Sequence, residues 1–208
     1  MLYTHIAFDI DGTLISSEYA NMKALQDTLL KFHGSAPALE ELLPYFGITG
    51  MDTLALLGVT DREVIYPYWA EHVHDYDDTI LPYDGVSEML TGLRNMGFAL
   101  GVVSSKKRAE YIRGFQPMDI SAFFSVRVLE EDTKTHKPGP EPLLRYLELT
   151  GAQPEKVLYV GDREGDLKCA RAAGVKFAFA RWGNPKGEMD ADYDLKVPGD
   201  LVTLLGRK

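Results

Sequence analysis

The sequence contains a single cysteine, Cys169, so an internal disulfide is excluded. Cys169 lies at helical spacing from Ala173, which predicts a buried apolar position rather than a reactive thiol. No apolar run approaches the roughly 18 residues that span a bilayer, and the N-terminal residues lack a basic segment followed by an apolar one. We therefore expect a cytoplasmic protein without a membrane partner.

Positive charge is scarce, with 22 Lys and Arg against 31 Asp and Glu and a formal net charge of −9. Because binding a nucleic-acid backbone requires clustered bases, this balance argues against a nucleic-acid partner. The negative excess is concentrated between Ile15 and Leu81, where three strong bases stand against eleven acids. Two nucleotide-binding motifs, GxGxxG and GxxxxGK[ST], are also absent, so dinucleotide and P-loop phosphate binding are not supported.

Hydrophobic periodicity divides the 208 residues into a first strand, a helical stretch and an alternating pattern. Helical spacing continues from Tyr19 to Tyr76, and Thr60–Glu63 is predicted to form a capping box. From Asp84 onward, predicted helices alternate with predicted strands at 98–103, 123–129, 157–160, 177–180 and 193–197. This order predicts an α/β fold: a Rossmann-like parallel sheet core with helices on both faces, residues 1–14 and 82–208, and a small inserted helical domain, residues 15–81.

The first predicted strand leads directly into two carboxylates, Asp9 and Asp11, followed by Gly12 and Thr13. Residues two apart in an extended chain point to the same side, so the two carboxylates converge unless the backbone turns between them. In open α/β sheets, ligands bind beyond the carboxyl ends of the strands. The Asp11-Gly12 pair alone would also fit a hairpin turn, but the later strand ends favour a functional site.

Three later strands are also followed by polar residues. They are Ser104 and Ser105 after the second strand, Lys137 after the third, and Gly161, Asp162 and Asp166 after the fourth. Because the carboxyl ends of parallel strands share one edge of the sheet, these residues are predicted to gather near Asp9. Arg163 and Glu164 begin the next helix and are expected to face solvent, although they stand close enough to the site to touch a substrate.

In this order the motifs resemble those of the haloacid dehalogenase superfamily, and within it the phosphoglycolate phosphatase-like enzymes with a helical cap inserted after the first motif. The matching segments are Asp9-Ile10-Asp11-Gly12-Thr13, Val103-Ser104-Ser105-Lys106, Lys137-Pro138-Gly139-Pro140-Glu141, and Gly161-Asp162 with Asp166. Asp84 stands where many relatives have proline. The resemblance spans nearly the whole chain and implies that residues 15–81 form the cap.

The chemistry of these residues is also that of a phosphatase. Asp9 can attack phosphorus as a carboxylate nucleophile, and Asp11 can transfer the proton. Lys137 and the Ser104 hydroxyl can hold the phosphoryl oxygens, on which negative charge accumulates. Because several carboxylates and a phosphate repel one another, the site needs a divalent cation, and hard oxygen ligands favour Mg²⁺.

The resemblance assigns individual roles. The Mg²⁺ ligands it implies are the Asp9 carboxylate, the Asp11 backbone carbonyl and the Asp162 carboxylate, while Asp166 holds a metal-bound water or orients Lys137. Phosphate binding is expected from Ser104, Ser105, Lys137 and Gly12. The cap residues expected to face the substrate are Tyr19, Lys23, Gly50 and Met51, although each also has a packing or solvent role as an alternative.

The expected activity is Mg²⁺-dependent hydrolysis of a small phosphate monoester through an aspartyl-phosphate on Asp9. A sugar-phosphate phosphomutase shares all four motifs and is the closest alternative. A hydrolytic dehalogenase would leave Asp11 and Asp162 without a role, and a non-catalytic binding protein would not need intact motifs.

The acidic cap predicts a small phosphorylated metabolite with a neutral or singly charged leaving group, unless Lys23 or Arg62 reaches inward. Bisphosphates and nucleoside triphosphates should be disfavoured. The sequence predicts no oligomeric state.

Overall fold

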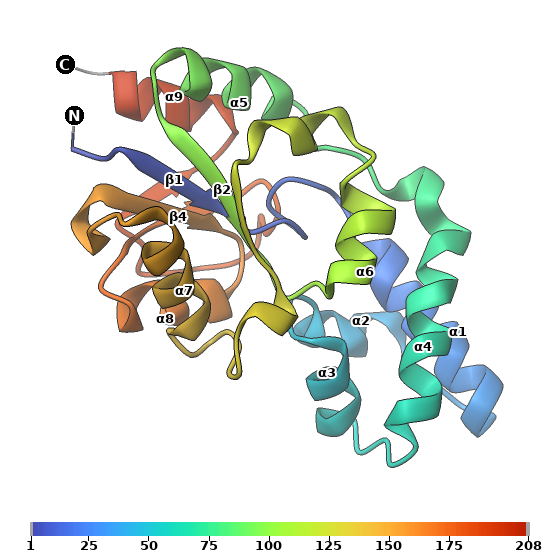
Figure 1. Cartoon of the computed structure of the whole chain (residues 1–208). Coiled ribbons are helices and arrows are strands. Elements are labelled where there is room, and N and C mark those ends of the chain that lie inside the picture. The colour runs from blue at the N-terminus through green and yellow to red at the C-terminus, as the bar shows by residue number, and fades with distance from the viewer. Residues whose placement is uncertain (1, 207–208) are drawn as a thin grey trace. The chain divides into compact units, whose positions relative to one another are not determined.

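Six parallel strands form one sheet in the part of the chain that the computed structural model describes, residues 2–206. They are β1 (His5–Phe8), β2 (Ala99–Val103), β3 (Val126–Val128), β4 (Val157–Gly161), β5 (Lys176–Ala180) and β6 (Tyr193–Leu195). Their order across the sheet is β3-β2-β1-β4-β5-β6. Figure 1 labels three of these strands, β1, β2 and β4. The central strands are continuous apolar runs because side chains on both faces of a parallel sheet are buried.

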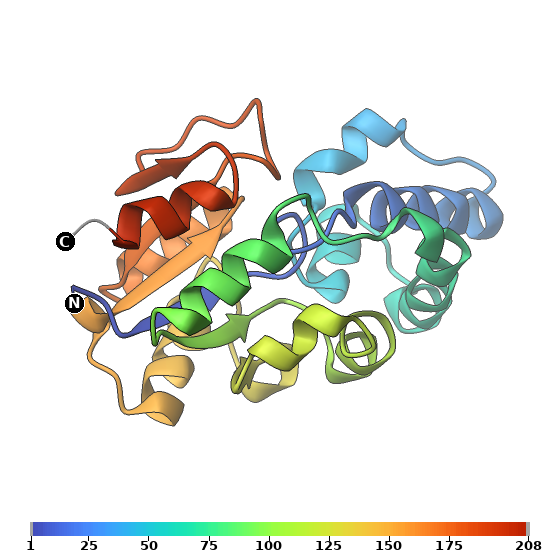
Figure 2. The same ribbon diagram turned by 90° about the horizontal axis from the view of Figure 1, so that it is seen from above.

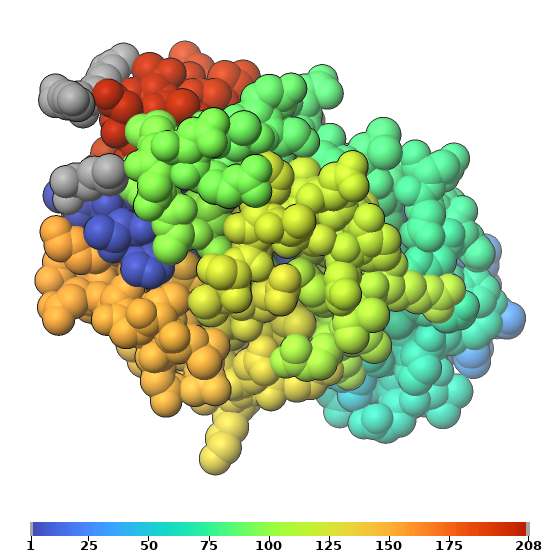
Figure 3. All heavy atoms as spheres, turned by 45° about the horizontal axis from the view of Figure 1, so that its top comes forward, coloured from blue at the N-terminus to red at the C-terminus, as the bar shows by residue number. Residues whose placement is uncertain are grey.

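Helices cover both faces of this sheet. On one face α5 (Val86–Asn95) packs against α9 (Gly199–Gly206), and on the other α7 (Glu141–Thr150) packs against α8 (Glu164–Ala172) (Figure 1). The short α6 (Arg108–Glu110) follows β2. Figure 2 shows α5 and α9 side by side over the strands, and their surfaces adjoin in Figure 3. The predicted α/β architecture is therefore confirmed.

The chain divides into two compact units. The core unit comprises Met1–Ile15 and Pro82–Lys208, and the helical unit comprises Ser16–Leu81. The helices of the second unit are α1 (Glu18–His33), α2 (Leu39–Leu42), α3 (Gly50–Leu56) and α4 (Arg62–His72), with 3₁₀ turns at Leu43–Tyr45 and Val73–Thr79. Apolar side chains such as Leu25, Leu54 and Trp69 give this unit a hydrophobic core of its own. Its role as a cap stays a prediction.

Two local predictions differ from the structure. The strand predicted at 123–129 is limited to β3, because Asp119–Phe123 forms a 3₁₀ turn. The capping box predicted at Thr60 is wrong, since α4 begins at Arg62 after Asp61 and no side chain caps it. Both errors concern short segments, in which few residues define the pattern.

The helix predicted to continue to Tyr76 ends at His72 and is followed by a 3₁₀ turn. Asp75 and Asp77 follow there, and acids near the C-terminus of a helix oppose its dipole. Cys169 is fully buried, as predicted. No helix among the described residues is long and apolar enough to cross a bilayer.

The register of β1 brings three strand ends together. Phe8, the last residue of β1, pairs with Val102 of β2 on one side and with Val160 of β4 on the other. The strand order reverses between β1 and β4, which is where ligands bind in open α/β sheets. The polar residues that emerge at this carboxyl edge are Asp9, Ser104 and Asp162.

Candidate active site

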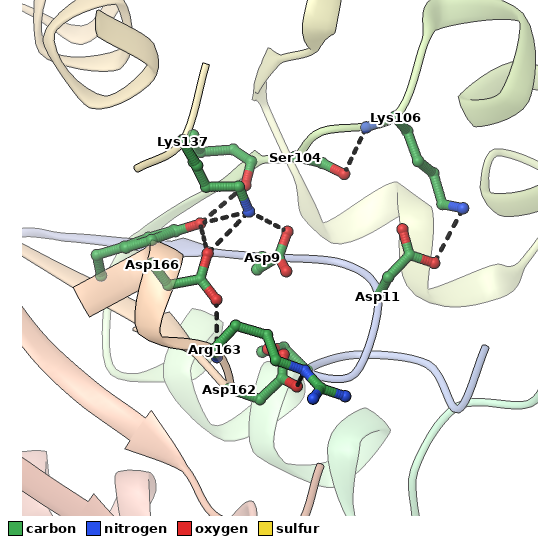
Figure 4. A network of polar contacts seen from close by, with 11 residues as sticks. Asp9, Asp11, Ser104, Lys106, Lys137, Asp162, Arg163 and Asp166 are labelled. Atoms are coloured by element: carbon green, nitrogen blue, oxygen red, sulfur yellow. Dashed lines mark hydrogen bonds and ion pairs between the residues drawn. The ribbon is translucent and has the colours of Figure 1, made fainter. Parts of the chain in front are cut away.

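Asp9 follows β1 and is almost completely buried, with 2% of its surface exposed. Its Oδ1 lies 2.9 Å from Nζ of Lys137, and the same ammonium donates to Asp166 Oδ1 at 2.8 Å (Figure 4). Lys137 comes from the loop before α7, and Asp166 from the first turn of α8. Although burial lowers the pKa of Lys137, Asp166 and Asp9 raise it above its ordinary value, so the lysine stays charged.

Tyr159, which the motifs do not single out, completes the hydrogen bonding of Lys137. Its hydroxyl lies 3.3 Å from Lys137 Nζ and 3.0 Å from both Asp166 Oδ1 and the carbonyl oxygen of Val103. The three ammonium protons are therefore shared among Asp9, Asp166 and Tyr159. The signal for Tyr159 in the sequence is a phenol in an otherwise aliphatic buried strand.

Asp162 is fully buried at the end of β4 and has two partners from different segments. Thr13 donates its hydroxyl to Oδ1 at 3.1 Å, and Arg163 Nε lies 2.9 Å from Oδ2. The expectation that Arg163 faces solvent is wrong, because burial of the adjacent carboxylate draws the guanidinium inward. Glu164 is exposed as predicted and pairs with Lys168.

The three carboxylates of Asp9, Asp162 and Asp166 can hold a metal ion. Each offers an oxygen within 4.8 Å of the others, and all three are buried. Burial raises the pKa of Asp9 to about 7. The positive charge of Lys137 opposes this rise, whereas the negative charges of Asp166 and Asp11 add to it. Burial and the charge of Asp166 likewise raise the pKa of Asp162 well above its usual value. The negative charge of the cluster thus exceeds the positive charge of the side chains around it, which favours binding of a cation. Because all the donor atoms are oxygens, Mg²⁺ fits the site.

The side chain of Asp11 points to a different partner from that of Asp9. Its Oδ1 lies 2.9 Å from Lys106 Nζ, and both side chains are largely buried (Figure 4). Asp11 is absent from the carboxylate cluster, which is consistent with a backbone rather than a side-chain contribution to a metal site. Lys106 belongs to the segment that resembles the second motif, but the sequence reasoning assigns it no role. Its signal in the sequence is a cation two residues beyond Ser104.

Of the residues predicted to bind phosphate, Lys137 contacts Asp9, and Ser104 lies near both side chains in Figure 4. Ser104 is buried after β2, and its Oγ accepts from the backbone N–H of Lys106 at 3.2 Å. Ser105 follows it and is half-buried. Gly12 adopts a positive φ of 80°, and a Cβ there would lie 2.4 Å from Asp162 Oδ2. Only glycine therefore lets this turn approach Asp162.

The substrate residues predicted in the helical unit fall into two groups. Tyr19 is half-exposed and stacks edge-on against Tyr76, while Lys23 pairs with Asp27. Gly50 and Met51 contribute to the unit's interior, with the backbone of Gly50 directly against the ring of Tyr66. The substrate role of all four stays a prediction.

Comparison with known proteins agrees with this geometry. The haloacid dehalogenase-like hydrolase family matches residues 6–180, which is most of the chain. The chain is a haloacid dehalogenase-like hydrolase. Pyrophosphatase PpaX of Bacillus cereus is 33% identical over 205 residues, which cover 96% of this chain and 95% of that relative.

Solved structures share the fold of this hydrolase. A Lactobacillus plantarum protein named as a candidate phosphoglycolate phosphatase matches with a TM-score of 0.89 at 26% identity, over 98% of this chain and 100% of that one. CbbY of Rhodobacter sphaeroides, solved in complex with phosphate, matches in fold with a TM-score of 0.80 at 18% identity, over 96% of each chain. The predicted family and the prediction of a phosphatase-type enzyme are confirmed.

Proposed function

We propose that this hydrolase cleaves small phosphate monoesters by transferring the phosphoryl group to Asp9, with Mg²⁺ as its cofactor. The observation that carries the proposal is the buried contact of Asp9 with Lys137, beside Asp162 and Asp166, at the end of β1. The ammonium orients the carboxylate for attack and supplies positive charge where phosphoryl oxygens become more negative. Relatives named pyrophosphatase and phosphoglycolate phosphatase support this class of reaction.

In the first transfer Lys137 holds Oδ1 of Asp9, and Oδ2 attacks phosphorus. The Oδ2–P bond forms while the P–O bond of the ester breaks. Lys137 and the Ser104 hydroxyl stabilise the equatorial oxygens of the phosphoryl group. Asp11, in its protonated form, donates its proton to the departing alkoxide, so the alcohol leaves uncharged.

In the second transfer a water molecule attacks the phosphorus of the aspartyl-phosphate. The Asp11 carboxylate removes a proton from this water while the P–Oδ2 bond breaks. Asp9 is thereby restored and inorganic phosphate is released. Lys106, 2.9 Å from Asp11, orients the carboxylate for both proton transfers.

The residues that would hold Mg²⁺ are the carboxylates of Asp9 and Asp162 and the backbone carbonyl of Asp11. When bound, the ion neutralises negative charge on the carboxylates and the phosphoryl group. Asp166 is assigned an orienting role, because Lys137 and Tyr159 bind its Oδ1 and the backbone N–H of Arg163 binds its Oδ2 at 3.1 Å.

Pyrophosphate is a second candidate substrate, because the relative from Bacillus cereus is named a pyrophosphatase. Its leaving group is phosphate, which is more negative than an alcohol and needs a cationic neighbour. The core unit places Lys106 beside Asp11, with Lys107 and Arg108 next in the chain. In the helical unit Lys23 is already paired, which supports the expected preference for leaving groups of low charge.

A screen of phosphorylated metabolites, with released phosphate as the readout, tests the proposal. We expect Mg²⁺-dependent release from simple monophosphates or pyrophosphate, and little from fructose bisphosphate or ATP. Asp9→Asn should abolish release because an amide is a poor nucleophile, whereas Asp119→Asn, at an exposed aspartate of the core unit, should not. Turnover in Asp9→Asn within about tenfold of the parent would contradict the mechanism.

Two alternatives have different products. A phosphomutase would convert a sugar phosphate into its isomer faster than it releases phosphate. A dehalogenase would release halide from a 2-haloacid and keep its activity after treatment with EDTA. We expect neither outcome, and a soak with beryllofluoride should place the phosphate mimic against Asp9 in a crystal.

A further inference from the structure

The loop at residues 181–187 follows β5 and binds the backbone of both segments that carry the site carboxylates. Trp182 donates its indole N–H to the carbonyl oxygen of Thr13 at 2.8 Å. Asn184 donates its side-chain amide to the carbonyl oxygen of Asp162 at 3.1 Å. One short loop therefore contacts the turn after Asp9 and the end of β4 together.

Gly183, between these two donors, lies directly against Gly12. A Cβ on Gly183 would lie 1.6 Å from the carbonyl oxygen of Gly12 and 3.2 Å from Cβ of Asp162. Backbone atoms cannot rotate away as the end of a side chain can, so any side chain at this position would push the turn and the loop apart. The loop and the first turn thus touch through the main-chain atoms of Gly183 and Gly12, with Asp162 alongside.

The loop is itself fixed to the edge of the sheet. Arg181 donates through Nε and Nη2 to the two carboxylate oxygens of Asp194 in β6, at 2.8 and 2.6 Å. Its Nη1 also binds the carbonyl oxygen of Gly187 at 2.8 Å, and Gly187 N–H binds the carbonyl oxygen of Asn184 at 3.0 Å. A bidentate ion pair fixes the orientation of the two side chains as well as attracting them. The pair between Arg181 and Asp194 therefore holds the start of the loop in place against β6.

We propose that Trp182, Gly183 and Asn184 are positioning residues that set the separation between the Asp9–Thr13 turn and Asp162, and thereby the Mg²⁺ affinity of the site. Their contacts are to carbonyl groups, so they act through the backbone and not on the reacting atoms. The Mg²⁺ part of this inference rests on the proposed function. Residues that orient metal ligands commonly change metal affinity by about 10–100-fold when they are replaced.

Three variants test the inference through Mg²⁺ affinity, measured calorimetrically without substrate. Gly183→Ala should raise the Kd for Mg²⁺ by at least about tenfold, because it separates the two segments. Trp182→Phe and Asn184→Ala each remove one donor and should raise the Kd by a few-fold to about tenfold. At saturating Mg²⁺ all three should recover most of the parent's kcat, a result that loss of a catalytic group would not give.

Two controls separate positioning from general destabilisation. Gly114→Ala adds a Cβ where nothing lies within 4 Å, and Lys186→Ala alters an exposed side chain of the same loop. Both should leave the Kd within about twofold of the parent. If Gly183→Ala does not fold, Trp182→Phe and Asn184→Ala still test the inference. Each variant loses one hydrogen bond from a half-buried side chain, so we expect both to fold.

Hydrogen exchange of the metal-free protein measures how firmly the first turn is held, and it does so independently of Mg²⁺. The amides of Gly12, Thr13 and Leu14 form the hydrogen bonds of the first turn and should exchange faster in the three variants than in the two controls. Failure of the parent to bind Mg²⁺ would refute the proposed cofactor but not the positioning. Folded variants with unchanged exchange in this turn, or with parental Mg²⁺ affinity in a parent that binds the ion, would overturn the inference.

Discussion

Replacing Asp9 with asparagine should remove a pH-dependent loss of stability from the metal-free protein. Asp9 is buried beside two other carboxylates, and burial raises its pKa from 3.8 to about 7, although Lys137 opposes the shift. An amide at this position keeps the oxygen that Lys137 binds but carries no charge at any pH. The variant therefore removes the ionisation of Asp9 from the cluster of buried carboxylates.

The sign and size of the effect follow from the shifted pKa. The folded state binds the Asp9 proton more tightly than the unfolded chain, so this group stabilises the protein fully below pH ~4, and that stability is lost as the pH rises through about 7. A shift of about three units corresponds to ~4 kcal/mol in total. More than half of this, on the order of 2–3 kcal/mol, falls between about pH 5 and about pH 8.

Urea unfolding in EDTA at about pH 5 and about pH 8 measures the effect. The free energy of unfolding of the parent should fall relative to that of Asp9→Asn by on the order of 2–3 kcal/mol over this interval. Taking the difference between the two proteins cancels titrating groups remote from Asp9, such as His5, whose pKa burial lowers. Asp162 contributes to the difference as well, because the charge of Asp9 helps to raise its pKa. The parent should consequently lose stability relative to the asparagine variant as the pH rises.

Mg²⁺ should offset this loss of stability in the parent. An ion that binds only the folded parent stabilises it by about 2.7 kcal/mol at one hundred times its Kd, and Asp9→Asn should gain less because it lacks one carboxylate ligand. If the free energies of unfolding of the two metal-free proteins show the same dependence on pH, the reasoning about a buried Asp9 carboxylate with a raised pKa is refuted.

Three further outcomes are expected. Chelation with EDTA should abolish phosphate release, and Ca²⁺ should restore it poorly because its larger coordination shell misplaces the nucleophile; full activity after chelation would exclude the Mg²⁺ assignment. Tyr159→Phe should lower the free energy of unfolding by about 1–3 kcal/mol, since it removes the hydroxyl 3.3 Å from Lys137 Nζ, and a urea midpoint equal to the parent's would show that this bond is dispensable. Thr13→Val should weaken Mg²⁺ binding by about tenfold, because the hydroxyl holds Asp162 Oδ1; Thr13→Ser should rescue it, and equal Kd values for all three proteins would remove Thr13 from the site.

The alternation of helices with apolar runs was enough to predict the parallel sheet, because period and burial are local properties of the chain. The polar residues that follow the strands were predictable for the same reason. Asp9, Ser104 and Asp162 each come directly after an apolar strand, and parallel strands deliver their carboxyl ends to one edge. The catalytic roles of these residues stay predictions.

Short segments were less predictable. The 3₁₀ turn at Asp119–Phe123 ends on an apolar residue, Phe123, which also suits a strand, so the strand was predicted to begin before β3. The start of α4 depended on one capping residue, and the structure places that start after Asp61 rather than after Thr60. Boundaries of this kind are set by a few weak backbone preferences.

What the sequence by itself determined, then, is the order of strands and helices and the chemical groups that stand at the strand ends. Only the tertiary structure decided which groups meet. Tyr159 reaches Lys137 from within a strand, and Trp182 binds Thr13 across 169 residues of sequence. Such contacts depend on the order of strands in the sheet and on the direction of each side chain. Periodicity along the chain gives neither the strand order nor the partner of a side chain. It reports whether a position is buried and not which distant residue lies beside it.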